Sequence, residues 1–471
     1  MQENSLALLP EIFMLVGAVT TLLAGSFLAR HKQFIAGYLA ITALAASTIA
    51  AINGLTEPAR TIFEGSFAVD DVTGLARLII PLATIFVLVL GLKELGGTSR
   101  ESETYALMLL AALGAMMMAG ASDLMVLAAG YLLASIPLYA LIGMSRSAGA
   151  AEAALKTYLL GAILGIALLL GVTLLYGIGG STSYGVLETS LRNAPPAAVA
   201  AGIIGVLAGL MFKAGGVPGH FWVPDATQTS GTAAAAFLTT IPKVGAIVAA
   251  YRLFDTMPDS VDWPLLVGVF AAVTMTLGNF TAFGQDDVRR LLGWSTVSQV
   301  GYLLLPVAVA GRAELALPSM MLYLAGYAAA NLTAFAVVGA LPGRRKIADY
   351  RGVAASHPWL AGALVVSLLG LVGTPPTVVF VGKLTTFTAA WDGGLAWLVV
   401  IAAVNTVASL FYYLRWLAPM FSRAVASSHP DPVAERHQGA VLISVGGAVA
   451  VIALGIASGA LMSILDSPIA R

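Results

Sequence analysis

The sequence predicts an all-α polytopic membrane protein with about fourteen transmembrane helices. Hydrophobic residues make up 59% of the 471 residues and charged residues only 10%, and the mean hydropathy is +0.90, which excludes an ordinary soluble domain. Apolar runs of about 20 residues, the length that crosses a bilayer, follow one another with short connections. Proline and glycine interrupt two of these runs, and broken helices at membrane depth are typical of ion pathways.

The apolar runs define the predicted spans. They cover residues 5–28, 34–53, 72–92, 104–121, 123–144, 154–178, 197–216, 232–254, 263–283, 291–310, 316–340, 358–380, 394–417 and 439–464. The first run lacks the basic start and the small-residue cleavage site of a signal peptide, so we expect it to remain as a helix. Pro218 follows the run 197–216 and Thr374-Pro375-Pro376-Thr377 interrupts the run 358–380, so both helices are predicted to be broken.

Positive charge predicts the orientation of the spans. Most lysines and arginines outside the spans lie in the loops after odd-numbered spans, whereas the opposite loops carry only Arg60, Arg192, Arg252 and Arg312. Because Lys and Arg favour cytoplasmic loops, both termini are predicted to lie outside. The charged segment 54–71 is predicted to be an extended or amphipathic excursion outside the membrane, or else a simple solvated loop.

The chain is predicted to form one membrane domain over residues 1–471, because no long polar linker divides it. The two interrupted spans lie five spans apart and each is associated with a lysine, as in transporters built from inverted repeats. We therefore expect two inverted five-helix repeats, 104–254 and 263–417, flanked by 1–92 and 439–464. The alternative is that the interruptions have no such meaning, since Pro and Gly are common in membrane helices.

Lysines inside the apolar runs are the main functional signal. A lysine at the bilayer centre costs roughly 2.5–3.5 kcal/mol on insertion scales, so such residues usually face the bundle interior or a water-filled path. The ionisable residues within the spans or just inside their ends are Glu11, Lys156, Lys213, Lys243 and Lys383, with His220 and Asp225 beside the interruption at Pro218. A lysine taken out of water binds its proton less tightly, so this set has the residue types of a proton relay.

Each of these residues also has a simpler interpretation. Lys213 and Lys243 could reach an interface from helix ends. Glu152 lies four residues before Lys156, so the two could form no more than an interfacial pair. His220 has the pKa range of a proton shuttle, yet a histidine beside a helix break could equally satisfy freed carbonyl groups.

Several other function classes are excluded by the sequence. The net charge is zero, so nothing indicates nucleic-acid binding. The absence of cysteine excludes disulfides, thiolate metal sites and an iron–sulfur cluster held by cysteines of this chain. The sequence has no glycine-rich phosphate loop and no histidine pair at metal or haem spacing. Any redox chemistry is therefore expected elsewhere.

Several short stretches of the chain form a set that is specific in combination. They are Leu9-Pro10-Glu11, Glu152 to Gly161 with Lys156, Phe212-Lys213 through Pro218-Gly219-His220 to Ala226, Pro242-Lys243, Gly278-Asn279, Asp287 to Arg290, Ser295 to Tyr302, Gly373 to Pro376, and Gly382-Lys383. Together they resemble the antiporter-like membrane subunits of respiratory complex I, and most of all the subunit N branch of that family. The resemblance extends over nearly the whole chain.

The resemblance implies fourteen helices, two inverted repeats and broken seventh and twelfth helices. It implies that Lys213, Lys243 and Lys383 hold the positions of the family's proton relay, with Lys156 at a further family lysine. It also implies that NADH, FMN, iron–sulfur clusters and quinone bind partner subunits, and that other membrane subunits and the lipid bilayer surround this chain. The location implied is the bacterial plasma membrane.

One departure from the family concerns its fifth helix. The family pattern there reads roughly Gly-Leu-Glu-Leu-Leu-Ser, and this chain has Gly130 to Ser135 with Leu132 in place of the glutamate. The carboxylate that would face Lys213 is therefore missing. Gln299 also stands where many relatives have a histidine, and Gln228 to Thr232 departs from the usual acidic segment.

Three functions remain open at this point. The first is a proton-translocating membrane subunit of an NADH:quinone oxidoreductase of complex I type, in which a buried lysine relay is coupled to quinone reduction elsewhere. The second is a subunit of a multisubunit cation/proton antiporter. The third is a structural paralogue that no longer pumps, which the missing glutamate favours and the retained lysines Lys156, Lys213, Lys243 and Lys383 disfavour.

Overall fold

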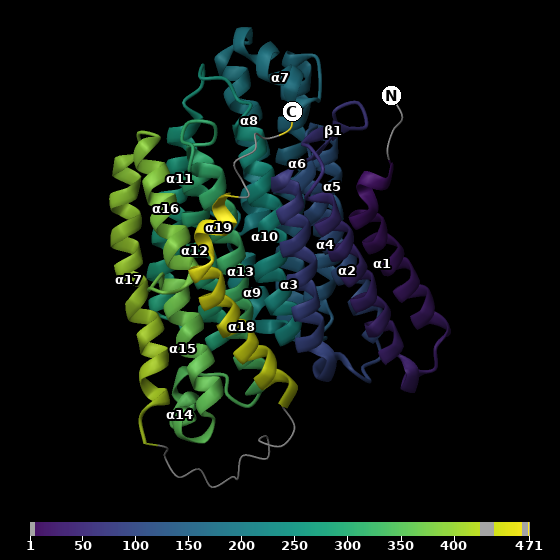
Figure 1. The fold of residues 1–471 in the computed structure, drawn as a ribbon, viewed down its shortest axis with the longest axis vertical. Coiled ribbons are helices and arrows are strands. Elements are labelled where there is room, and N and C mark those ends of the chain that lie inside the picture. Colours follow the sequence, from purple (N-terminus) through teal and green to yellow (C-terminus); the bar gives the residue numbers. More distant parts are fainter. Residues whose placement is uncertain (1–4, 424–437, 464–469, 471) are drawn as a thin grey trace.

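The computed structural model describes residues 5–423, 438–463 and 470, and these form a bundle of helices that run side by side (Figure 1). Thirteen helices of this part of the chain are long and apolar enough to cross a membrane. The chain is thus a multi-pass membrane protein, and the predicted fold class is confirmed.

The elements follow one another with short connections. The first half contains η1 (Ser5–Leu8), α1 (Leu9–Phe27), η2 (Arg30–Lys32), α2 (Phe34–Gly54), β1 (Arg60–Ile62), β2 (Phe67–Val69), α3 (Asp71–Leu95), α4 (Glu101–Gly120), α5 (Leu124–Gly143), α6 (Ala148–Gly179), α7 (Tyr184–Ser190), η3 (Leu191–Asn193), α8 (Pro196–Ala214), α9 (Trp222–Thr229) and α10 (Thr232–Phe254). The second half contains α11 (Trp263–Phe283), α12 (Val288–Ala308), α13 (Ala316–Ala340), η4 (Ile347–Tyr350), α14 (Val353–Ser356), α15 (Pro358–Val372), α16 (Val378–Asp392), α17 (Ala396–Met420), α18 (Gln438–Ile456) and α19 (Ser458–Met462).

The two predicted helix breaks are present. α8 ends at Ala214 and its continuation α9 begins at Trp222, whereas α15 ends at Val372 and α16 begins at Val378. The twelfth passage is therefore two helices of 15 residues each, and the span predicted to end at residue 380 extends to Asp392. With this divided passage the thirteen long helices make the predicted fourteen passages. The assignment of repeats at 104–254 and 263–417 remains a prediction.

Two other predictions need correction. α6 has 32 residues and starts at Ala148, six residues before the predicted span 154–178. The segment 54–71 is not a simple solvated loop, because β1 and β2 pair in an antiparallel hairpin with Thr61 opposite Ala68. The last predicted span, 439–464, forms α18 and α19, and its final residue lies outside the described residues.

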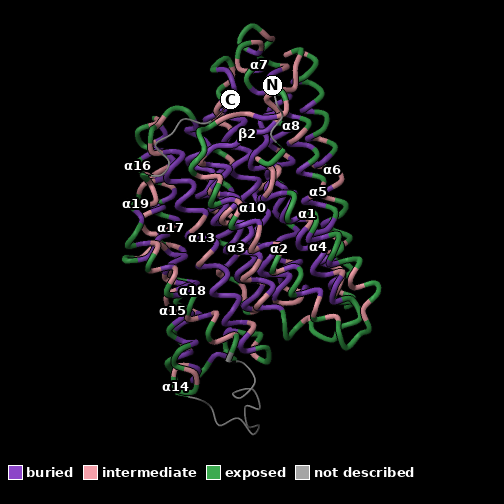
Figure 2. Tube along the Cα trace, turned by 45° about the vertical axis from the view of Figure 1, so that its right-hand side comes forward, coloured by how far each residue is buried: buried purple, intermediate pink, exposed green. Residues whose placement is uncertain are grey.

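The most completely buried helices lie at the centre of the bundle. The apolar windows of α10 and α12 are entirely buried, and those of α1, α6, α17 and α18 are buried over a third or less, which leaves their outer faces free for lipid or partners (Figure 2). A helix that is apolar all round belongs in an interior, which explains the central position of α10.

Glycines allow the inner helices to approach backbone to backbone. A Cβ atom added at Gly245 of α10 would lie 2.3 Å from the carbonyl oxygen of Ala115 in α4. One added at Gly278 of α11 would lie 2.4 Å from the backbone nitrogen of Ser298 in α12. No side chain fits at either place. We call these two backbone contacts, between α4 and α10 and between α11 and α12, the glycine seams.

Two buried ion pairs tie the first helices to the rest. Arg77 of α3 donates to both carboxylate oxygens of Glu11 in α1, over 2.7 and 2.8 Å. Arg252 of α10 donates to Oδ1 of Asp70 over 2.5 Å, and the backbone N–H of Ala470 donates to Oδ2 of the same carboxylate over 3.0 Å. Glu11, predicted as part of a relay, thus has a strong structural partner.

Candidate functional site

The break between α8 and α9 is built around Gly215. Its φ of +84° is left-handed, a conformation that glycine adopts at little cost. The N–H groups of Gly215 and Gly216 both donate to the carbonyl oxygen of Met211, over 2.8 Å each, which ends the helix. The chain then passes through a cis bond to Pro218 before α9 begins.

Lys213 lies in the last turn of α8, two residues before this break. Its side chain is fully buried, so the alternative that it reaches an interface is wrong. Its Nζ has no hydrogen-bond partner among the described residues. The atom lies 5.2 Å from the ring centre of Tyr131 in α5, within the range of a cation–π contact.

Lys243 faces the same break from α10. It is also fully buried, and its Nζ donates to the carbonyl oxygen of Leu238 over 3.3 Å. The Nζ lies 5.7 Å from the ring of Trp222, whose Nε1 donates to the carbonyl oxygen of Phe212 over 3.0 Å. The structure therefore brings Lys213 and Lys243 to one helix break. Their positions in the sequence alone do not reveal this proximity.

Lys383 lies at the second break, in the second turn of α16. Its Nζ donates to two carbonyl oxygens left free at the end of α15, those of Leu371 over 3.2 Å and Val372 over 2.9 Å. It also lies 4.1 Å from the ring centre of Tyr302 in α12. Because the end of a helix leaves carbonyl groups without partners, the break itself supplies the binding site for this ammonium group.

Gln299 joins the second break to the central helices. Its Nε2 donates to the same Leu371 carbonyl over 2.8 Å, and its Oε1 accepts a hydrogen bond from the Tyr323 hydroxyl over 2.5 Å. All these side chains are buried. Gln299 therefore lies between Lys383 and α13.

His220 lies in the connection from α8 to α9 and is buried. Its ring is tilted against those of Phe221 at 4.1 Å and Trp294 at 5.7 Å, measured between centroids. Neither ring nitrogen has a hydrogen bond of ordinary geometry within the described part of the chain, but the ring interacts with the backbone of Pro218. This contact is compatible with the alternative that His220 satisfies a carbonyl group freed by the break.

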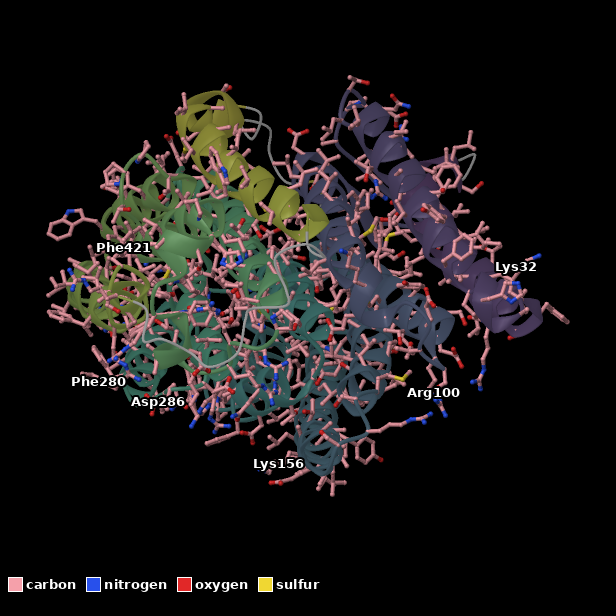
Figure 3. All side chains as sticks on the ribbon, turned by 90° about the horizontal axis from the view of Figure 1, so that it is seen from below. Lys32, Arg100, Lys156, Phe280, Asp286 and Phe421 are labelled. Atoms are coloured by element: carbon pink, nitrogen blue, oxygen red, sulfur yellow. The ribbon has the colours of Figure 1, made fainter. Side chains whose placement is uncertain are left out.

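Lys156 differs from the three other lysines, because its side chain is about half exposed whereas theirs are buried. Its Nζ lies 2.6 Å from Glu152 Oε1 and 3.1 Å from Asp225 Oδ2. Arg290 donates to the other oxygen of Asp225 over 2.7 Å. The predicted Glu152–Lys156 pair is present, within a cluster of charges that includes Asp225 and Arg290, and Figure 3 shows Lys156 at the periphery of the bundle.

Leu132, which occupies the position of the family's glutamate, points its side chain outward. Its side chain is 43% exposed, whereas its neighbour Tyr131 is buried and lies under Lys213. Leu132 therefore lies on an outer face of α5 together with Ile136.

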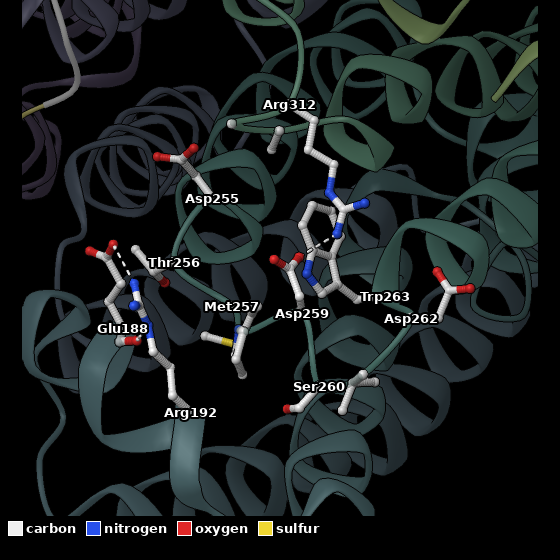
Figure 4. Close-up of a pocket in the computed structure, with 14 residues that line it drawn as sticks. Glu188, Arg192, Asp255, Thr256, Met257, Asp259, Ser260, Asp262, Trp263 and Arg312 are labelled. Carbon is white, nitrogen blue, oxygen red and sulfur yellow. Dashed lines mark hydrogen bonds and ion pairs between the residues drawn. The ribbon is translucent and has the colours of Figure 1, made fainter. Parts of the chain in front are cut away.

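One open pocket contains none of the four lysines. It has a volume of about 1160 Å³ and lies between α7, the loop 255–262 and Arg312 (Figure 4). Ion pairs of Glu188 with Arg192 and of Asp259 with Arg312 line it. Within the described residues no group of three His, Asp or Glu side chains is placed to hold a metal ion.

Several buried polar residues were not singled out from the sequence. Arg77 and Arg252 hold the ion pairs described above, although Arg252 was counted as a loop residue. Tyr323, Tyr327 and Asn331 recur at every fourth position of α13, and that spacing is the signal that would have found them.

Comparison with known proteins assigns this chain to one family. Residues 121–409 match the family model described as "NADH:quinone oxidoreductase/Mrp antiporter, TM". NADH-quinone oxidoreductase subunit N of Mycobacterium sp. (strain JLS) is 53% identical over 449 residues, which cover 95% of this chain and 96% of that protein. Subunit N 1 of Streptomyces griseus subsp. griseus is 49% identical over 463 residues, 98% of each chain.

Solved structures agree in fold. A chain of respiratory complex I from Thermus thermophilus with bound aureothin superimposes with a TM-score of 0.84 at 29% identity, over 98% of this chain and all of that one. A chain of the Mrp complex from Dietzia sp. DQ12-45-1b superimposes with a TM-score of 0.85, over 99% of this chain and 97% of that one, and its 22% identity supports the fold alone. The chain belongs to the NADH-quinone oxidoreductase subunit N family, within the wider family of NADH:quinone oxidoreductase and Mrp antiporter membrane subunits.

Proposed function

We propose that this chain is a proton-translocating membrane subunit of an NADH:quinone oxidoreductase, in which Lys213, Lys243 and Lys383 carry protons through the bundle. One observation supports this most strongly. Three lysines are almost completely buried at two helix breaks, each with its ammonium group over an aromatic ring. Burying a cation is expensive, so three of them in one bundle interior indicate a task that needs them.

The proposed chemistry needs only proton transfer by these side chains. Lys213 and Lys243 flank the same break, so a proton on one disfavours a proton on the other by charge repulsion. Binding of a proton by Lys243 therefore promotes the release of a proton from Lys213, and binding by Lys213 promotes release from Lys243. His220 is proposed as a shuttle beside the break, since it is buried there and neither ring nitrogen has a hydrogen bond of ordinary geometry among the described residues.

Partner subunits complete the proposed assembly. NADH, FMN, iron–sulfur clusters and quinone are proposed to bind there, and redox energy to reach this chain through its contacts with other membrane subunits. The proposed location is the bacterial plasma membrane with both termini outside, supported by the concentration of Lys and Arg in the loops after odd-numbered spans.

The test compares Lys213→Met and Lys243→Met in the assembled complex in vesicles. Proton transport per electron pair is expected to fall for both, while assembly is unchanged. Lys32→Met, which removes an exposed lysine at the end of the bundle, is the matched control and should leave transport unchanged. Normal transport in both buried variants with normal assembly would refute the proposal.

Leu132 supports a second candidate, a structural subunit that does not pump. Lys213→Met distinguishes the two. If the native chain transports protons and Lys213→Met abolishes this, the relay works without the carboxylate. If the native chain and Lys213→Met give equal transport per electron pair, the chain has kept its fold without its pump. The antiporter alternative predicts that transport depends on the concentration of Na⁺ or K⁺.

A further inference from the structure

A stripe of polar side chains runs along the buried helix α13. Tyr323, Tyr327 and Asn331 lie four residues apart and therefore share one face of the helix. None of the three has any exposed surface. Because burying a polar group costs free energy unless it is hydrogen-bonded, such a stripe in an apolar span requires specific partners.

At one end the stripe contacts the Lys383 site. The Tyr323 hydroxyl donates to Gln299 Oε1 over 2.5 Å, and Gln299 Nε2 donates to the Leu371 carbonyl that also accepts from Lys383. α13 and α16 approach closely here, since a Cβ atom added at Gly382 would lie 3.0 Å from the Cα of Tyr323. Tyr323 and Lys383 are thus linked through one amide and one carbonyl.

At the other end the stripe contacts α10, which carries Lys243. The Tyr327 hydroxyl lies 2.7 Å from the Thr239 carbonyl oxygen and 3.1 Å from Thr296 Oγ1. Asn331 Nδ2 donates to the hydroxyls of Thr239 and Thr240 over 3.0 and 2.9 Å. Thr239 lies one helical turn before Lys243. The polar stripe therefore joins the helix of one buried lysine to the site of another.

The chemistry of these groups limits how a proton could pass. An amide such as Gln299 has no site that takes up a proton near neutral pH, so it positions its neighbours rather than carrying charge. A tyrosine hydroxyl has both a donor and acceptor lone pairs, so it can accept one proton while releasing another. We propose that the Tyr323 hydroxyl passes protons between Lys383 and the α10 side of the bundle, with Gln299 as its positioning residue. This inference rests on the proposed function.

The transfer is balanced at Tyr323. One proton leaves the ammonium group of Lys383 and, directly or through a water molecule, binds the hydroxyl oxygen. The original hydroxyl proton leaves its hydrogen bond to Gln299 at the same time and passes, through water molecules, to the neutral amine of Lys243 on α10, and the hydroxyl then rotates back. Tyr323 ends neutral, Lys383 ends as an amine, Lys243 ends as an ammonium group, and no electron is transferred.

The experiment measures proton transport per electron pair in the assembled complex in vesicles, for Tyr323→Phe beside Lys383→Met. Phenylalanine keeps the ring and removes only the hydroxyl. The expected result is that Tyr323→Phe reduces transport as far as Lys383→Met does, while quinone reduction and assembly persist. The matched control is Tyr105→Phe, a buried tyrosine of α4 that is hydrogen-bonded to Glu101, and it should transport normally.

A second variant tests the positioning residue independently of folding. Histidine can change its charge within the physiological pH range, so Gln299→His should give transport a dependence on pH that the native chain lacks. A merely structural role for Gln299 would lower transport equally at every pH. That result, with normal assembly, would overturn the positioning assignment.

The outcomes separate the two proposals. If Tyr323→Phe transports normally while Lys383→Met does not, the Tyr323 inference fails and the lysine relay stands. If Lys383→Met also transports normally, the relay itself fails. Should Tyr323→Phe not assemble, Gln299→Leu takes its place, because it removes the hydrogen bond that holds the Tyr323 hydroxyl, and normal transport in that variant would overturn the inference.

Discussion

The two helix breaks share one backbone design and hold their lysines differently. In each, the N–H groups of a left-handed glycine and of the next residue donate to one carbonyl oxygen, that of Met211 in the first break and Leu369 in the second. A cis X–Pro bond follows two residues later, at Pro218 and Pro376. In each break a lysine lies over a tyrosine from a Gly-Tyr-Leu-Leu sequence, Gly130 to Leu133 or Gly301 to Leu304.

The difference lies in where the lysine stands relative to the break. Lys213 precedes its break and has only the Tyr131 ring beside its ammonium group, with no hydrogen-bond partner among the described residues. Lys383 follows its break and donates to two carbonyl oxygens that the break exposes. The same backbone design can therefore leave a cation unpaired or bind it, depending on which half-helix carries it.

The largest expected effect on stability comes from replacing Gly215 or Gly373, the left-handed glycines of the two breaks. Forcing a side chain into the left-handed conformation costs about 1–2 kcal/mol at either position. A Cβ at Gly215 would also lie 2.7 Å from Val223 Cγ2, and overpacking adds about 1–3 kcal/mol. A Cβ at Gly373 meets only the flexible Lys383 side chain, at 3.0 Å. In thermal unfolding of the complex, Gly215→Ala should therefore destabilise more than Gly373→Ala, and equal effects would contradict this.

Removing the lysines should affect stability in opposite ways. Lys383→Met leaves the Val372 carbonyl without the donor it had, which costs about 1–3 kcal/mol. Lys213→Met replaces an unpaired buried cation by an apolar chain of similar length, so the unfolding temperature should stay equal or rise. Thermal unfolding of both variants checks this, and a larger loss for Lys213→Met would refute the described difference.

The aromatic rings offer a finer comparison. A cation–π contact contributes about 0.5–2 kcal/mol, depending on desolvation. Because Lys213 depends on its ring alone among the described contacts, Tyr131→Leu should reduce proton transport more than Tyr302→Leu does. Tyr131→Phe keeps the ring and is the control. Equal losses in the two leucine variants would show that the carbonyl groups do not hold Lys383.

The smallest effects are expected for single hydrogen bonds within each break. Trp222→Phe removes the bond from Nε1 to the Phe212 carbonyl but keeps an aromatic ring beside Lys243. Thr377→Val removes the bond from Oγ1 to the Thr374 carbonyl. Each should cost about 0.5–1.5 kcal/mol in thermal unfolding. A loss of transport in Trp222→Phe without loss of stability would give the indole N–H a role beyond structure.

The spans and both breaks could be predicted from the sequence, because they depend on local properties. An apolar run of bilayer length forms a helix wherever it lies, and Pro218 and Pro376 interrupt theirs through their own covalent structure. The same logic located Lys213 and Lys243 within spans, whereas Lys383 lay three residues beyond the predicted end of its span at residue 380. Their burial followed because lipid does not tolerate a charge on an outer face.

The contacts between distant helices could not be predicted. Lys156 lies in the third turn of α6, where Asp225 of α9 meets it at the end of the bundle, and only the packing of these helices shows that it is half exposed. Tyr323 finds its partner, Gln299, on α12, and the Leu371 carbonyl comes from α15. Neither partner follows from the residues around Tyr323 in the chain.

The glycine seams between inner helices have a consequence for energy conservation. A protein that carries protons along some paths must insulate the membrane everywhere else, since any leak dissipates the gradient. Backbones in contact at Gly245 and Ala115, and at Gly278 and Ser298, leave no width for a file of water molecules. These residues carry no charge and move no proton, yet their close contact keeps water, and with it protons, from passing between the helices.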